Sequence, residues 1–208
     1  IHWLRESAKQ ANPYAHHRLG LCYLHGTGVQ LNRETAFKWY KSGANLDHTA
    51  SKNYLGYCYT HGCGVEQNLE KGFKWYLQAA VEGSASAQYN AGYAYYFAQG
   101  VAKDYKKAFG WFLKAADQGG VGAQYRVAGC YRYGDGVKKN LKKAVEYHTK
   151  AANQGYAKAQ YALACLYDDG KGVEENDVTA FQWYEKAAKQ GHKIAQYCLA
   201  VCYEIGQP

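Results

Sequence analysis

The stretch Tyr23-Leu24-His25-Gly26-Thr27-Gly28-Val29 decides the fold, because its pattern Tyr-x-x-Gly-x-Gly-Val returns at a constant spacing. The pattern starts once more at Tyr203, and at 95–101 Ala98 replaces the first glycine. The complete copies begin 36 residues apart and lie at 23–29, 59–65, 95–101, 131–137 and 167–173. A fixed period of this length predicts a solenoid of stacked repeats.

Each repeat reads as two helices joined by a short loop. Ala15, Leu19 and Tyr23 lie on one face of the first helix, where small residues let neighbouring helices approach closely. Gly26 suits a left-handed cap at its end, and Asn32 suits the N-cap of the second helix. The sequence therefore predicts an all-α chain with half a repeat at each end and five complete helix-turn-helix repeats, at 13–48, 49–84, 85–120, 121–156 and 157–192.

No linker-like segment interrupts these repeats, so residues 1–208 are expected to form a single solenoid. The chain begins inside a repeat and without Met, and we expect it to be a piece of a larger protein. We see neither a signal peptide nor an apolar run long enough to span a membrane. Because Ala98 lacks the freedom of glycine, we expect the first helix of the third repeat to end differently.

The five tryptophans occupy one column of the repeat, which predicts that they pack in the core between repeats. They are Trp3, Trp39, Trp75, Trp111 and Trp183. Each tryptophan directly precedes the residue that corresponds to Tyr40 on the second helix of its repeat. We expect Trp111→Ala to be a large core truncation.

Seven cysteines are present, and four of them share one column: Cys22, Cys58, Cys130 and Cys202. Equivalent positions of stacked helices lie about 10 Å apart, whereas a disulfide needs Cα atoms within about 7 Å. We therefore expect free thiols and favour a reducing compartment, the cytoplasm. Cys63 stands between two glycines, and we expect it to be exposed.

The formal charge of +8 and the pI of about 9.0 fit either a lysine-rich solvated surface, which we favour, or an acidic partner. The basic residues that crowd the middle of the chain include Lys138, Lys139, Lys142 and Lys143. They fall in a loop and the first turn of a helix, whereas the aromatic residues of this region lie on another helix. Binding of nucleic acid, which combines the two, is therefore not expected.

The repeat resembles that of the Sel-one-like repeat (SLR) family, a relative of the tetratricopeptide repeats. The matching residues are Ala159-Gln160-Tyr161, Gly170–Val173 and Trp183–Ala188. The resemblance covers the whole chain and implies a right-handed α/α superhelix whose first helices line the concave side. It also implies a role as a scaffold or adaptor, often in signalling.

No arrangement of residues for catalysis is evident, and we expect no enzyme activity, catalytic residue or cofactor. His25, His61 and Cys63 are possible zinc ligands by type, but we favour their interpretation as surface residues and expect no metal.

The tetratricopeptide analogy places one face of each first helix in the groove, and this face is rich in tyrosine. Aromatic residues and arginine are enriched where binding energy concentrates. The candidate partner-binding residues are Tyr57, Tyr89, Tyr93, Tyr96, Phe97, Arg132 and Tyr133. They predict a module that binds a peptide or protein segment in its concave groove.

Two alternatives remain open. The chain could be a regulatory or positioning segment of a larger multidomain enzyme. It could also be a hydrolase acting on cell-wall or lactam compounds, which only the cysteine-rich branch of the family suggests.

Overall fold

The computed structural model describes residues 1–204 and 206, and over these residues all regular secondary structure is helical. The first six helices are α1 (His2–Lys9), α2 (Pro13–His25), α3 (Arg33–Asn45), α4 (Thr49–His61), α5 (Leu69–Val81) and α6 (Ala85–Phe97). The next six are α7 (Tyr105–Asp117), α8 (Val121–Tyr133), α9 (Leu141–Asn153), α10 (Ala157–Asp168), α11 (Asp177–Lys189) and α12 (Lys193–Glu204).

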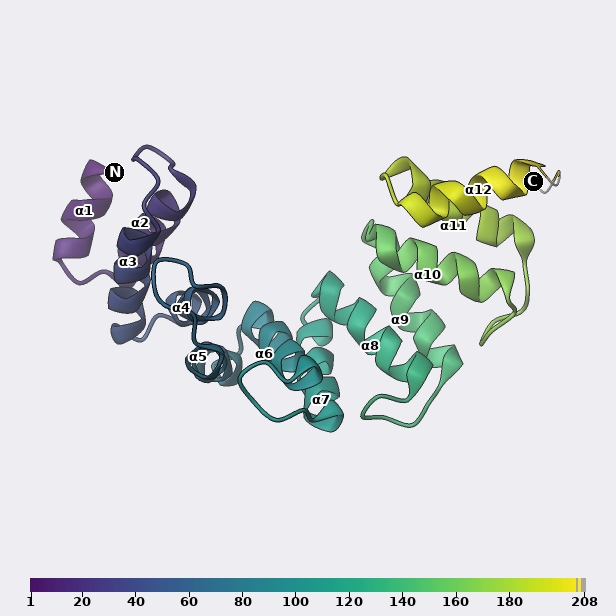
Figure 1. The fold of residues 1–208 in the computed structure, drawn as a ribbon, viewed down its shortest axis with the longest axis horizontal. Coiled ribbons are helices and arrows are strands. Elements are labelled where there is room, and N and C mark those ends of the chain that lie inside the picture. The colour runs from purple at the N-terminus through teal and green to yellow at the C-terminus, as the bar shows by residue number, and fades with distance from the viewer. Residues whose placement is uncertain (205, 207–208) are drawn as a thin grey trace. The chain divides into compact units, whose positions relative to one another are not determined.

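The helices form two compact units, and the boundary lies between Asp104 and Tyr105. Helices α1 to α6 belong to the first unit and α7 to α12 to the second. Within each unit, helices that follow one another in the chain pack side by side (Figure 1). The prediction of an all-α solenoid of helix-turn-helix repeats is confirmed.

The caps of the helices follow the sequence closely. A side-chain oxygen at the position of Asn32 accepts a hydrogen bond from the backbone N–H three residues later. The same cap is made by Asn68, Asn140 and Asn176. At the other end of the first helices, Gly26 has the left-handed conformation that the pattern predicted, with a φ of 72°.

Ala98 corrects one expectation, because α6 ends like its counterparts. Ala98 has a φ of 58° and a ψ of 40°, which is the left-handed conformation of the glycines in its column. The Gln99 N–H then donates to the Ala94 carbonyl at 2.9 Å and closes the cap. The surrounding structure imposes this conformation on an alanine, at a cost of about 1–2 kcal/mol.

The second glycine of each loop has a different role from the first. A Cβ at Gly64 would lie 2.0 Å from the carbonyl oxygen of Arg33, at the first turn of α3. The corresponding distance is also 2.0 Å for Gly136 and Tyr105. The backbone of the loop thus packs directly on the preceding repeat, and only glycine allows this approach.

The buried aromatic column is the one next to the tryptophans. Tyr40 is fully buried and Tyr184 is 3% exposed, whereas Trp39 is half-buried and Trp3 is 81% exposed. Trp39 packs from one side against a cluster that contains Leu19. The prediction that the tryptophans form the core is therefore right only in part, since adjacent helix positions point about 100° apart.

All seven cysteines are free in the structure. The expectation that Cys63 is exposed is wrong, because its side chain is only 7% exposed and packs with Cys58 in one apolar cluster. The Cys63 N–H donates to the Cys58 carbonyl at 2.9 Å, which turns the loop back onto the helix end. The reducing compartment stays a prediction.

An ion pair with a buried lysine replaces a pair of glutamines in the second repeat. Lys52 is 5% exposed and bonds to Asp47 and Glu82. Two repeats later the corresponding residues are glutamines, and Gln154 Nε2 donates to Gln124 Oε1 at 2.8 Å. The same pair recurs as Gln190 and Gln160, at 2.7 Å. One position in the array therefore accepts either a charged or a neutral pair.

We expect Lys52→Gln and Glu82→Gln each to lower the free energy of unfolding by about 1–2 kcal/mol, because each removes a charged hydrogen bond of the buried Lys52 ammonium, which in Glu82→Gln keeps only Asp47 as its partner. The double variant reproduces the glutamine pair and should lie within about 1 kcal/mol of the wild type. Urea unfolding of all four proteins measures the coupling. Strictly additive losses would show that the two side chains do not interact.

Candidate functional site

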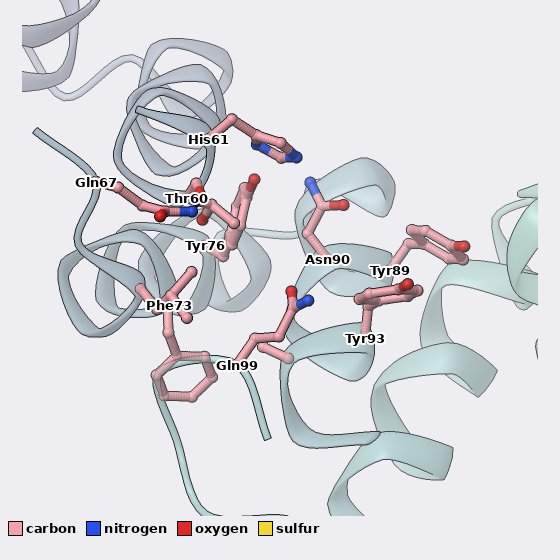
Figure 2. Close-up of a pocket in the computed structure, with 11 residues that line it drawn as sticks. Thr60, His61, Gln67, Phe73, Tyr76, Tyr89, Asn90, Tyr93 and Gln99 are labelled. Atoms are coloured by element: carbon pink, nitrogen blue, oxygen red, sulfur yellow. Dashed lines mark hydrogen bonds between the residues drawn. The ribbon is translucent and has the colours of Figure 1, made fainter. Parts of the chain in front are cut away.

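A pocket of about 450 Å³ lies in the first unit, where α6 packs beside α5 and reaches α4 through a hydrogen bond between Asn90 and Asn53 (Figure 2). Its lining is aromatic and polar and contains no carboxylate, lysine or arginine. The lining residues are Thr60, His61, Gln67, Leu69, Phe73, Tyr76, Tyr89, Asn90, Tyr93, Ala94 and Gln99.

One wall is built around Tyr76, which is 5% exposed. Burial raises the pKa of the Tyr76 hydroxyl to about 12, and a hydrogen bond with Thr60 opposes this rise. Thr60 Oγ1 also donates to the Gly56 carbonyl at 2.9 Å, and Gln67 Nε2 donates to the Thr60 carbonyl at 2.7 Å. These bonds hold neutral polar groups in fixed positions at neutral pH.

The opposite wall comes from α6 and carries Tyr89, Asn90 and Tyr93 (Figure 2). Asn90 Nδ2 donates to Asn53 Oδ1 at 3.0 Å, which fixes the orientation of the Asn90 amide. His61 lies across from Asn90, with its Nδ1 3.1 Å from the Tyr57 carbonyl oxygen. This hydrogen bond requires the proton on Nδ1, so Nε2 is an acceptor in the neutral form of the ring.

Four of the predicted residues of the first unit form a connected aromatic row on α6. Tyr89 contacts Tyr93, Tyr93 contacts Phe97 and Phe97 contacts Tyr96, with ring centroids 6.2, 4.4 and 4.8 Å apart. Tyr57 lies on α4 and stacks on His61, with ring centroids 4.2 Å apart. Tyr89 and Tyr93 line the pocket itself.

Arg132 and Tyr133 lie in the second unit and contact each other. The Arg132 guanidinium carbon is 5.6 Å from the centre of the Tyr133 ring, and Tyr133 is 69% exposed. On the following helix, α9, His148 is 2% exposed. Burial and then the charge of Arg132 lower the pKa of His148 to about 4.

Sequence reasoning missed most of the polar lining of the pocket. Thr60 and His61 fall on the helix face that the tetratricopeptide analogy assigns to the groove, but neither is among the predicted binding residues, and neither are Asn90 and Gln99. Asn90 precedes Tyr93 by three residues, so helical spacing places both on one face and its position is a usable signal. Gln99 comes from a loop, which helical periodicity does not place.

The pocket offers fixed donors and acceptors beside large aromatic faces. Such a lining suits orientation of an uncharged polar group together with burial of an apolar one. Over the described residues, no three or more His, Cys, Asp or Glu side chains gather as a metal site. No helix in residues 1–204 is long and apolar enough to cross a membrane.

Comparison with family models identifies the Sel1 repeat in five consecutive segments of this chain. They are residues 13–48, 49–84, 85–120, 121–156 and 157–192. These bounds coincide with the repeats that the sequence period predicted. A comparison with curated proteins gave no match.

Solved structures with the same fold include two at 34% identity. One is c5321, a protective antigen of uropathogenic Escherichia coli with an SLR fold, which superposes with a TM-score of 0.92 over 98% of this chain. The alignment spans only 44% of that antigen. The other is a Sel1 repeat protein from Oxalobacter formigenes, with a TM-score of 0.88 over 95% of this chain and 79% of its own.

Proposed function

Because this chain belongs to the Sel1 repeat family, whose members are generally protein-interaction scaffolds, we propose that it is a non-enzymatic scaffold or adaptor. It binds a peptide or protein segment in the tyrosine-lined groove of its first unit. The groove consists of the pocket described above together with the aromatic row of α6.

The observation that carries this proposal is the neutral, pre-oriented lining of the pocket. The Asn90 amide is fixed by Asn53, and His61 presents an acceptor nitrogen nearby. Backbone N–H and C=O groups of an extended segment are neutral donors and acceptors that such side chains can pair with. The rings of Tyr93 and Phe97 offer apolar area for a side chain of the same segment.

We expect Tyr93→Ala to weaken partner binding about 30-fold, because it removes the ring that links the pocket to the rest of the row. This factor corresponds to the loss of about 2 kcal/mol that is typical of an interface hot spot. Partners are captured from a lysate with the wild-type chain, identified, purified and titrated by calorimetry.

Tyr14→Ala is the matched control, since Tyr14 is 70% exposed on α2 and does not line the pocket. A second comparison changes Lys138, Lys139, Lys142 and Lys143 to glutamine, which should alter mainly the association rate and its salt dependence. If this variant loses binding while Tyr93→Ala retains it, the groove is not the binding surface.

A further inference from the structure

We propose that the surface around Arg132 in the second unit binds a carboxylate, supplied by a glutamate or aspartate side chain of the partner segment. This inference rests on the proposed scaffold function and specifies the chemistry of its partner. The site consists of Arg132 and Tyr133 at the end of α8, His148 on α9 and Tyr161 on α10.

The repeat register shows how this surface differs from the pocket of the first unit. Basic residues occupy three positions of the second unit whose counterparts two repeats earlier line the pocket. Arg132 corresponds to Thr60, Lys139 to Gln67 and Lys171 to Gln99. In the same register, Tyr76 of the pocket wall corresponds to His148, and Tyr89 corresponds to Tyr161. These three positions are therefore neutral in the first unit and positively charged in the second.

Arg132 holds the charge that is available to a ligand. None of the ion pairs formed among the described residues involves Arg132, whereas Lys171 Nζ is 2.9 Å from a carboxylate oxygen of Asp169. The Arg132 side chain is half-buried, with the Tyr133 ring beside it. Its charge also acts on Tyr161, since it counteracts the rise in the pKa of that hydroxyl.

A half-buried guanidinium without a counter-charge favours an anionic ligand, because it has lost part of its hydration without gaining a partner. A carboxylate matches the planar guanidinium with two parallel hydrogen bonds. One unpaired guanidinium balances one carboxylate, whereas a phosphate carries closer to two charges.

The test uses two blocked peptides that differ by one charge, N-acetyl-Ala-Glu-Ala-amide and N-acetyl-Ala-Gln-Ala-amide, with the complete 208-residue chain. We expect the Glu peptide to bind about tenfold more tightly, as a charge-assisted hydrogen bond predicts. NMR of the histidine rings supplies a second readout. A carboxylate at Arg132 offsets the charge that lowers the His148 pKa, so this pKa should rise with the Glu peptide and stay unchanged with the Gln peptide.

Arg132→Gln should abolish the tenfold preference and raise the His148 pKa without any peptide. The double variant Arg132→Thr and His148→Tyr reproduces the Thr60 and Tyr76 pair of the second repeat, so it should fold and also lose the preference. Equal affinity of the two peptides for the wild type would overturn the inference. Tighter binding of the phosphoserine peptide N-acetyl-Ala-phosphoserine-Ala-amide that depends on Arg132 would also overturn it, in favour of phosphate.

The identified partner separates this inference from the scaffold function. Loss of partner binding in Tyr93→Ala but not in Arg132→Gln would leave the scaffold role intact and reject the carboxylate site. If Arg132→Gln weakens partner binding as much as changing one Glu or Asp of the partner to its amide does, both the scaffold function and the carboxylate site are supported.

Discussion

Tyr40→Ala is expected to lower the free energy of unfolding by about 3–5 kcal/mol, because it removes a fully buried aromatic ring from the first repeat. The ring fills the space above Gly20, where an added Cβ would lie 2.4 Å from a Tyr40 ring carbon. It also stacks on Tyr54 with centroids 5.0 Å apart. Denaturant unfolding of the wild type and the variant measures the difference.

Tyr40→Phe is the matched control. The Tyr40 hydroxyl is buried and makes no hydrogen bond to a described residue, and burial raises its pKa well above the ordinary value. The hydroxyl therefore contributes little, and the phenylalanine variant should lie within about 1 kcal/mol of the wild type or above it. Tyr184→Phe should cost about 1 kcal/mol, because the Tyr184 hydroxyl donates to Asp168 at 3.0 Å.

Trp39→Ala supplies the comparison between the two aromatic columns. Trp39 is half-buried and packs from one side, so its removal should cost about half as much as that of Tyr40. If Trp39→Ala lowers the free energy of unfolding more than Tyr40→Ala does, the tryptophan column contributes more to the core than the column of Tyr40.

His148→Phe is expected to make stability less sensitive to acid. Burial lowers the His148 pKa from an ordinary value of 6.5 to about 4, so the folded protein keeps the ring neutral where the unfolded chain takes up a proton. The wild type therefore has the full contribution of His148 above about pH 6.5 and loses it as the pH falls toward 4. The total loss is on the order of 3 kcal/mol.

The measurement is the difference in free energy of unfolding between His148→Phe and the wild type at pH 7.5 and at pH 4. Phenylalanine is already present in this column as Phe112, and the variant also removes a buried Nδ1 that bonds to no described residue. The difference should grow toward low pH in favour of the variant. His17, whose pKa burial likewise lowers to about 4, titrates in both proteins and cancels. A difference that is constant with pH would show that folding does not perturb His148.

The sequence by itself determined the repeat and its helices. The spacing of Tyr23 and Gly26 gave the period, and the asparagine at position 32 marked the start of the second helix. These signals are local, because a helix cap involves only residues within one turn of it. The aromatic row of Tyr89, Tyr93 and Phe97 could be predicted for the same reason, since helical spacing places these residues on one face.

Only the tertiary structure decided which of two adjacent aromatic columns is buried and which polar groups meet. Trp39 and Tyr40 are equally good core residues by composition, and the packing of α3 against α2 and α4 selects Tyr40. Likewise His61 and Asn90 meet across a pocket because α4 and α6 converge there, and no spacing within one helix encodes that contact. Ala98 shows the same principle for the backbone, since packing of the whole repeat outweighs the conformational preference of a single residue.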